Sequence, residues 1–348
     1  MKFAILKNEF DDNHEYWERS CKQYGIDYQI IDLLDSEWLR KANGQLFDAY
    51  LACPSGRETV YKNMYDERIF ILDKVLGRFV YPNFDEISLH ENKKFLSYWL
   101  QATQLPHPAT RVFYNAGEAL EYIESCTMPV VGKINIGASG KGVKVFRERS
   151  DLESYIKSAF DGGIRQEWGP NIRMGGYGAR IINIIKNPAI IKKKLTIYRK
   201  VYNEIQRGFV ILQEYIPHQY EWRLVRIGDS YFGHQKIKHG DKASGTKGIE
   251  YIAPPGELLN MVRDICDKYG FRCMAVDLFE DGNGGYLINE MQCIFGHVQE
   301  YICEKDGVAG RFVDLNGNWE FESGMFNSNL SYDLRLQDII NILNRPVL

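Results

Sequence analysis

Two acidic residues in the last third of the chain have the type and spacing expected of a metal site. Asp277 lies in the apolar run MAVDLF and Glu290 in LINEM, with the turn-forming segment EDGNGG between them. This pattern predicts a hairpin with both carboxylates on one face near its open end, and Gln292 on the same face two residues later. Magnesium prefers oxygen ligands and is usually held by one or two carboxylates together with phosphates. We therefore expect a magnesium site, although a hairpin with plain surface acids would show the same spacing.

The glycine-rich segment NIGASGKG at 135–142 has the composition of a phosphate-binding loop. Its glycines would let the backbone approach phosphate oxygens, and its serine and lysine would add a hydroxyl group and a charge. The spacing is not that of a Walker A motif, and the strand-to-helix setting of a dinucleotide site is absent. An ordinary hairpin turn explains the glycines equally well. The candidate phosphate contacts in the loop are Gly137, Ser139, Gly140, Lys141 and Gly142.

Two lysines could complete a phosphate site. Lys133 lies in the apolar strand VVGKIN, and Lys93 lies in the segment HENKKF, which is expected to begin a helix over 90–105. A lysine among apolar neighbours must reach water or meet an anion, because an unpaired buried ammonium is costly. A solvent-facing position is the commoner explanation for each lysine alone, but the adjoining glycine loop favours phosphate for Lys133.

The segment ILQEYIPHQYEWR at 211–223 is an apolar strand that becomes polar at its end. An adenine ring needs an apolar slot with one backbone carbonyl and one backbone N–H, which such a connecting strand can offer. Glu221 could accept hydrogen bonds from ribose hydroxyls. Taken alone, the segment fits an interior strand that ends in a loop.

The secondary structure that must position these residues follows two different patterns along the chain. The first 85 or so residues alternate strand and helix signals, which predicts a small parallel sheet with helices on both faces. Beyond residue 209 strand signals dominate. The other expected elements are helices over 116–125, 190–206, 257–269 and 335–344, strands over 129–135 and 143–146, and a hairpin within 311–321.

Composition narrows the class of protein. The chain has 348 residues, 45% of them hydrophobic, and a net charge of −3, which gives no general drive toward nucleic acid or anionic membranes. Seven cysteines without a C-x-x-C pair favour a reducing cytoplasm over a disulfide framework. The apolar runs are too short for a signal peptide or a membrane span. We expect a cytoplasmic protein, and a homodimer is one option for its oligomeric state.

The ordered set of motifs resembles the ATP-grasp superfamily, from the first strand to about residue 300. The resemblance implies an α/β (α+β) fold with a small parallel N-terminal α/β domain over 1–88. Two α+β subdomains that clasp ATP would follow, a lid over 89–215 and a C-terminal subdomain over 216–348 with the magnesium site. The segment 161–208 would be an elaboration of the lid with a basic face.

The resemblance also implies roles for individual residues. Lys93 and Lys133 match the two phosphate lysines, and Glu221 matches the ribose acid. The segment EWR resembles a D-I-R element, which points to Arg223, and Lys236 stands where a basic residue often faces the phosphates. The segment that resembles the adenine hinge supplies Gln213, Glu214, Tyr215 and Ile216, and the D…E-x-N magnesium set is matched by Asp277, Glu290 and Gln292.

Three departures from the family pattern stand out. Asn92 precedes Lys93 where aspartate is usual, Gln292 replaces asparagine, and no arginine lies just before Asp277.

The activity that the resemblance implies is that of an ATP- and Mg²⁺-dependent ligase that joins a carboxylate, on a small molecule, glycan or peptide, to an amine. A kinase that phosphorylates a hydroxyl and a nucleotide-binding regulatory protein without catalysis are the alternatives.

Overall fold

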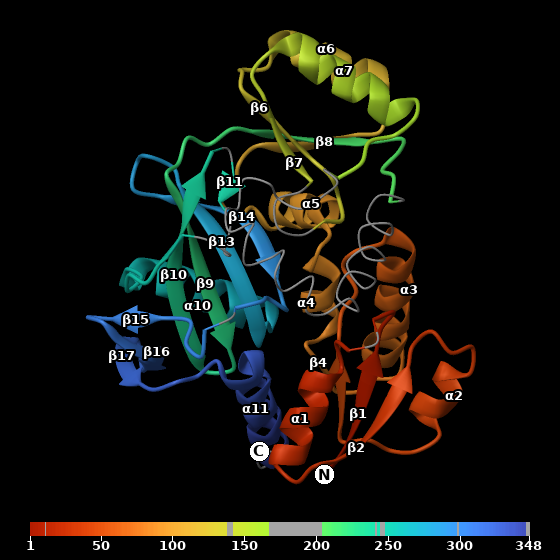
Figure 1. Ribbon diagram of the computed structural model, residues 1–348, viewed down its shortest axis with the longest axis vertical. Helices are drawn as coiled ribbons and strands as arrows, with labels where there is room; N and C mark the ends of the chain where they lie inside the picture. Colours follow the sequence, from red (N-terminus) through yellow and green to blue (C-terminus); the bar gives the residue numbers. More distant parts are fainter. Residues whose placement is uncertain are drawn as a thin grey trace, which may run out of the picture.

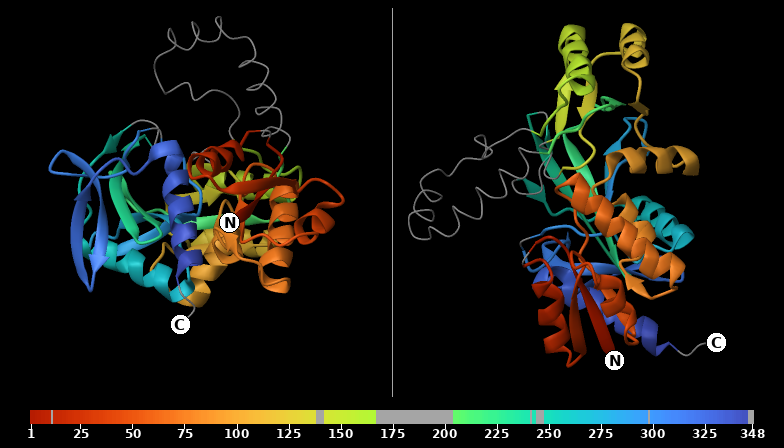
Figure 2. Two further views of the ribbon diagram at one scale, coloured as in Figure 1. Left: turned by 90° about the horizontal axis from the view of Figure 1, so that it is seen from below. Right: turned by 90° about the vertical axis from the view of Figure 1, so that its right-hand side faces the viewer.

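The computed structural model describes residues 1–10, 12–137, 142–166, 204–240, 242–243, 248–297 and 299–345, which form three sheets (Figure 1). The N-terminal sheet and the central sheet lie toward opposite ends of the long axis (Figure 2). Among the described residues, no helix is both long and apolar enough to cross a bilayer. The fold is the predicted mixed α/β fold.

The N-terminal sheet is parallel, as the alternating strand and helix signals predict. Its strand order is β2-β1-β3-β4, and residues 3–6 of the central strand β1 are fully buried, as expected for a strand with helices on both sides. The strands are β1 (Lys2–Lys7), β2 (Asp27–Asp32), β3 (Ala49–Ala52) and β4 (Val80–Tyr81). The helices are α1 (Glu15–Gln23), α2 (Trp38–Asn43) and α3 (Thr59–Phe70), which continues into the π-helical turn η1 (Ile71–Val75).

The central sheet is antiparallel, in the order β5-β8-β6-β7, and it has a hydrophobic core of its own. The predicted hairpin around the glycine loop is confirmed by the β6–β7 pairing. The strands are β5 (Thr110–Phe113), β6 (Val130–Lys133), β7 (Val143–Phe146) and β8 (Val210–Glu214). The helices of this region are α4 (Phe84–Leu89), α5 (Lys93–Thr103), α6 (Ala116–Ser125) and α7 (Arg149–Phe160), of which α6 and α7 pack side by side beyond the sheet (Figure 1).

The C-terminal sheet is built around the order β14-β13-β9-β10-β16-β15. Its strands are β9 (Tyr220–Ile227), β10 (Ser230–His239), β11 (Lys242–Ala243), β12 (Ile249–Glu250), β13 (Cys273–Glu280), β14 (Tyr286–Gln292), β15 (Glu304–Lys305), β16 (Val308–Leu315) and β17 (Asn318–Ser323). Its helices are α10 (Gly256–Tyr269), the 3₁₀ turn η2 (Ser328–Ser331) and α11 (Tyr332–Asn344).

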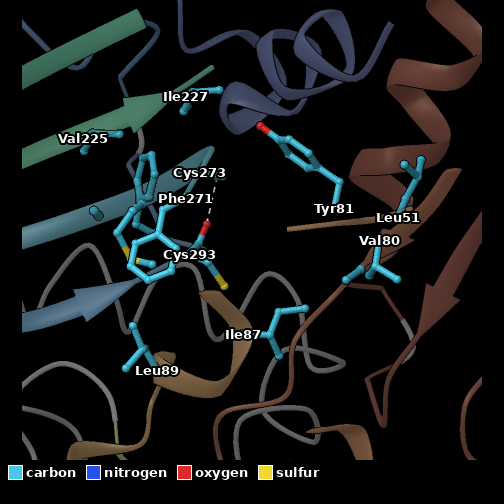
Figure 3. Close-up of a cluster of buried hydrophobic side chains, with 14 of the residues drawn as sticks. Leu51, Val80, Tyr81, Ile87, Leu89, Val225, Ile227, Phe271, Cys273 and Cys293 are labelled. Atoms are coloured by element: carbon cyan, nitrogen blue, oxygen red, sulfur yellow. Dashed lines mark hydrogen bonds between the residues drawn. The ribbon is translucent and has the colours of Figure 1, made fainter. Parts of the chain in front are cut away.

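The N-terminal and C-terminal sheets share one hydrophobic core. Leu51 and Tyr81 from the first sheet belong to the same buried cluster as Val225 from the last sheet and Phe271, which lies just before β13 (Figure 3). Helix α11 packs against α1, where the hydroxyl of Ser20 donates a 2.6 Å hydrogen bond to Asp333. The C-terminal helix therefore fixes the first sheet against the last.

The predicted elements are found with small changes at their ends. The helix expected over 90–105 begins at Lys93, because the side chain of Asn92 caps it by accepting from the backbone N–H of Phe95 at 3.3 Å. The helix expected over 190–206 lies outside the described residues apart from 204–206, which are not helical. The domain limits at 88/89 and 215/216 stay a prediction.

Gly228 and Gly270 both have a left-handed backbone conformation, but replacing them with alanine should lower the stability of the protein by different amounts. Gly228 has φ +59°, and a Cβ there would lie 2.5 Å from Oδ1 of Asp338, which is held by Arg272. Gly270 has φ +69° and no atom within 4 Å of its Cβ position. Gly270→Ala should cost about 1–2 kcal/mol for the left-handed conformation, and Gly228→Ala about 1–3 kcal/mol more for the clash. Urea unfolding of both variants checks this, and equal losses would contradict it.

Candidate functional site

A pocket between the central and C-terminal sheets collects most of the predicted site residues. One part of its wall comes from α5, β6 and β8, and the facing part comes from β9, β10, β13 and β14. The predicted residues that line it are Lys93, Lys133, Gln213, Glu214, Tyr215, Ile216, Glu221, Lys236 and Glu290, together with Gly137 of the glycine loop. Arg223, Asp277 and Gln292 are not part of this wall.

Strand register places four polar residues in one row across the C-terminal sheet. His234 of β10 faces Arg223 of β9, Arg223 faces Asp277 of β13, and Asp277 faces Glu290 of β14. Because directly opposed residues in antiparallel strands share a face, the predicted placement of both carboxylates on one face follows from the register. The sequence gives no sign that Arg223 would lie between His234 and Asp277.

A β-bulge changes the lining of the pocket beside this row. The pairing shifts from Asp277–Glu290 to Leu278–Ile288, so that Asn289 is an extra residue on β14. An extra residue breaks the alternation of side chains between the two faces, and both Asn289 and Glu290 line the pocket. Lys133 donates a 2.8 Å hydrogen bond to the side-chain oxygen of Asn289. The bulge thus joins the C-terminal sheet to the central one.

Asp277 is the centre of a buried ion network. Both of its oxygens accept from Arg223, at 2.7 and 2.8 Å, and Lys236 donates to Oδ2 at 2.6 Å. Lys236 also lies 2.6 Å from Oε2 of Glu221. Burial would raise the pKa of Asp277, but the charges of Arg223 and Lys236 outweigh burial and lower that pKa below its ordinary value. Asp277 is therefore ionised at neutral pH.

Glu290 is the more accessible of the two predicted metal ligands. Its side chain is 25% exposed, whereas that of Asp277 is 3% exposed. Gln292 donates a 3.1 Å hydrogen bond from Nε2 to Glu91, which leaves its amide oxygen as the atom available to a metal. The described residues contain no group of three or more histidine, cysteine or acidic side chains placed to hold a metal ion. A metal here would need further ligands from a bound molecule or water.

The two predicted phosphate lysines differ in their surroundings. Lys93 donates a 2.8 Å hydrogen bond to the carbonyl oxygen of Gly137 and lies 3.6 Å from both Glu91 and Glu290. Burial opposes its charge, but the two carboxylates outweigh burial and raise the pKa of Lys93. For Lys133 burial prevails and lowers the pKa from 10.5 to about 8, despite an opposing effect of Glu290. Of these two lysines, Lys93 is therefore firmly charged, whereas Lys133 titrates near pH 8.

The side chains of two predicted hinge residues, Gln213 and Glu214, make hydrogen bonds to the neighbouring strand region. Nε2 of Gln213 donates to the hydroxyl of Thr110 at 2.9 Å, and Oε1 of Glu214 accepts from the backbone N–H of Ala109 at 2.6 Å. Both side chains therefore fasten β8 to the β5 side of the sheet. The stretch beyond β8, from Tyr215 to Ile216, leaves the ladder and lines the pocket.

Part of the predicted glycine loop lies outside the described residues, namely Ser139, Gly140 and Lys141. The two ends of the loop are described. The carbonyl oxygen of Gly142 accepts from the backbone N–H of Ile134 at 2.8 Å, and Gly137 lines the pocket. Gly137, the last described residue before this gap, therefore lies at the edge of the site.

No protein-family model and no curated protein matches the sequence. Solved structures match in fold. A RimK domain ATP-grasp protein from Sphaerobacter thermophilus superposes with a TM-score of 0.51 at 16% identity, over 84% of this chain and 90% of that one. The chain has the ATP-grasp fold.

Two further ATP-grasp structures match along nearly the whole chain. D-alanine–D-alanine ligase from Bacillus anthracis, complexed with ATP, has a TM-score of 0.54 at 14% identity, over 99% of this chain and 98% of that one. N5-carboxyaminoimidazole synthetase from Staphylococcus aureus, complexed with ADP, has a TM-score of 0.56 at 11% identity, over 97% and 76%. The ATP-grasp fold predicted from the ordered motifs is confirmed.

Several residues that line the pocket were not predicted. They are Val131, Val143, Val145, His218, Phe279 and Asn289. Val143 and Val145 lie on one face of β7, on either side of the exposed Lys144, and this spacing predicts a shared face but not the group that the face contacts. His218 could have been predicted to line the pocket, because it follows Ile216 and Pro217 in the segment that resembles an adenine hinge.

Proposed function

We propose that this protein is an ATP- and Mg²⁺-dependent ligase that joins a carboxylate to an amine and releases ADP and phosphate. The observation that carries the proposal is the convergence of Lys93, Lys133 and Lys236, from three different elements, on one pocket. All three ammonium groups are largely buried, and an anion with several charges would stabilise such a set. The names of similar ATP-grasp structures, among them a ligase and a synthetase, agree with this class of reaction.

The chemistry of the wall fits a nucleoside triphosphate. Val131, Val143, Val145 and Phe279 give one part of the pocket an apolar surface suited to a base, and the three lysines give another part positive charge suited to phosphates. Glu221 lines the pocket and can accept from a sugar hydroxyl. The residues that would hold ATP are thus Lys93, Lys133, Lys236, Tyr215, Ile216 and Glu221, with the loop residues Ser139, Gly140, Lys141 and Gly142 as an untested part of the set.

A magnesium ion held in this pocket would neutralise charge that develops on the phosphates. Glu290 is the carboxylate best placed to hold it, because Asp277 has cationic donors on both oxygens. Arg223 lies behind the wall and clamps Asp277 in place. We propose that Arg223 acts as a positioning residue, whereas Lys236 reaches the pocket itself.

In the proposed reaction an oxygen of the substrate carboxylate attacks the γ-phosphorus of ATP, and ADP leaves. The amine then attacks the carbonyl carbon of the acyl phosphate, the C–O bond to phosphate breaks, and the nitrogen loses a proton. Lys93 and Lys133 would hold the transferred group in line and stabilise its charge, so that positioning and electrostatics supply most of the rate.

The test is ADP and phosphate release from Mg-ATP in pools of carboxylates and amines, with mass spectrometry of the products. A condensation product formed in equal amount to phosphate supports the ligase. A phosphorylated product without free phosphate would show a kinase, and ATP binding without turnover in any pool would favour a regulatory protein.

ATP binding is expected to take up protons near pH 8. Burial lowers the pKa of Lys133 to about 8, so at that pH the amine is only partly protonated. A triphosphate beside it would favour the charged form and raise its pKa again. Titration calorimetry at pH 8 in two buffers of different ionisation enthalpy should report up to about half a proton taken up, because about half of the Lys133 amines already carry their proton at that pH. Lys133→Met should abolish this uptake, and heats independent of the buffer would contradict the expectation.

A further inference from the structure

Glu91 lies in the turn between α4 and α5, and only 6% of the residue is exposed. Its backbone has φ +49°, in the left-handed region that residues other than glycine seldom occupy. A Cβ at Gly56 would lie 2.7 Å from Cγ of Glu91, so the glycine lets the loop after β3 pack directly against this side chain. A buried charged residue held in an uncommon backbone conformation points to a role that the surrounding structure maintains.

The carboxylate of Glu91 contacts two predicted site residues that lie far apart in the sequence. Oε1 accepts a 3.1 Å hydrogen bond from Nε2 of Gln292, at the end of β14. Oε2 lies 3.6 Å from Nζ of Lys93, and the same ammonium group lies 3.6 Å from Oε1 of Glu290. Glu91 therefore lies beside the end of the pocket where Glu290 would hold a metal, although the sequence motifs do not include it.

The hydrogen bond to Glu91 determines which atom of the Gln292 amide is free. An amide has an NH₂ group that donates and an oxygen that accepts, and rotation of the amide exchanges them. Burial raises the pKa of Glu91, but the nearby ammonium group of Lys93 favours the ionised carboxylate, which can only accept. The NH₂ group of Gln292 then faces Glu91, and its oxygen faces away. The structure describes no donor to that oxygen, and Gln292 is half-buried.

We propose that Glu91 is a positioning residue of the metal site, which turns the amide oxygen of Gln292 toward the metal. The inference rests on the proposed function, because it takes a divalent cation beside Glu290 as the occupant. With its NH₂ group toward the metal, Gln292 could not be a ligand, since that group offers no lone pair to a cation. A glutamine side chain also has considerable rotational freedom, so without a fixed partner its oxygen could turn away.

The experiment measures how much Mn²⁺, used in place of Mg²⁺, tightens the binding of ADP. Titration calorimetry gives the Kd of ADP in the presence of EDTA and the Kd of Mn-ADP, and their ratio is the contribution of the metal. Glu91→Met removes the acceptor at a similar side-chain length, and it should lower this ratio by about tenfold or more. Glu91→Gln removes the charge but keeps an oxygen that can accept from Gln292, so it should lower the ratio by less than about threefold.

Gln292→Ala is the background that tests whether Glu91 acts through the amide. This change should itself lower the ratio, and adding Glu91→Met to it should lower the ratio no further, because the residue that Glu91 positions is already gone. Gly56→Ala is an independent variant, since its Cβ would displace the side chain of Glu91 without changing any charge or metal ligand. It should also lower the ratio.

The outcomes separate this inference from the proposed function. The inference is wrong if Glu91→Met leaves the ratio unchanged, if Glu91→Gln loses as much as Glu91→Met, or if the loss persists in the Gln292→Ala background. If Glu91→Met does not fold, Gly56→Ala decides, because an unchanged ratio in that variant would contradict the inference. If Mn²⁺ does not tighten the binding of ADP to the wild-type protein, the metal site of the proposed function itself fails.

Discussion

Replacing Lys133 with methionine is expected to lower kcat/KM for ADP formation by at least about a hundredfold, because an electrostatic contact with the transferred phosphate is lost. Methionine has a similar length and suits the apolar neighbours of β6. Described contacts of the Lys133 ammonium group are limited to a 2.8 Å hydrogen bond to Asn289, so little of the fold depends on its charge.

The same variant should be at least as stable as the wild-type protein. Lys133 has a folded-state pKa of about 8, below the value of about 10.4 expected in the unfolded chain. A lysine with a lowered folded pKa binds its proton more tightly when unfolded, so it reduces stability below pH 8. Lys133→Met should therefore gain up to about 3 kcal/mol at pH 7, and the gain should shrink as the pH rises from 8 to 10.

Lys144→Met is the matched control for Lys133→Met. Lys144 lies on β7 opposite Gly132, and the residue opposite Lys133 is Val143, so the two lysine side chains point to different faces of the hairpin. Lys144 is exposed and does not line the pocket. Its replacement should leave ADP formation unchanged. Equal rates in Lys133→Met and the wild-type protein would remove Lys133 from the site.

Replacing Asp277 with asparagine is expected to destabilise the protein by roughly 3–5 kcal/mol, because it leaves buried cations without their charge partner. Arg223 loses both of its described ion-pair contacts to the carboxylate, and Lys236 keeps only Glu221. Urea unfolding at pH 7 measures the change.

Glu290→Gln should lower the rate of ADP formation strongly while changing the stability of the protein little. Glu290 faces Asp277 in the register, but its described ion pair is a single 3.6 Å contact with Lys93, and its side chain is partly exposed. The loss of stability should stay below about 1 kcal/mol, while ADP formation should fall by at least about a hundredfold, because the metal loses its principal carboxylate. A large loss of stability in Glu290→Gln, or a small one in Asp277→Asn, would contradict the division of roles between the two acids.

Local patterns predicted the elements of this fold well. The strand and helix alternation of the first 85 residues and the turn EDGNGG between two apolar runs depend on neighbours in the sequence. The hairpin around the glycine loop was found for the same reason. The start of α5 was placed three residues early, because the capping role of Asn92 was not recognised.

Long-range pairings in the site could not be predicted from spacing. That Asp277 and Glu290 share one metal stays a prediction, and spacing gave no sign that Arg223 of the neighbouring strand β9 and Lys236 of the next strand β10 would hold Asp277. That pairing depends on the order of strands in the sheet, which no local pattern records. The bulge that brings Asn289 to Lys133 is likewise a product of the register between strands.

The central claim is that a carboxylate is activated by phosphoryl transfer before an amine attacks it. The most direct measurement uses the acid substrate found in the pooled assay, labelled with ¹⁸O in its carboxylate, and reads the released phosphate by mass spectrometry. The reaction proposed here transfers one carboxylate oxygen to phosphate, so each phosphate should carry one ¹⁸O atom. Unlabelled phosphate, formed while the acid and amine are joined, would contradict the account.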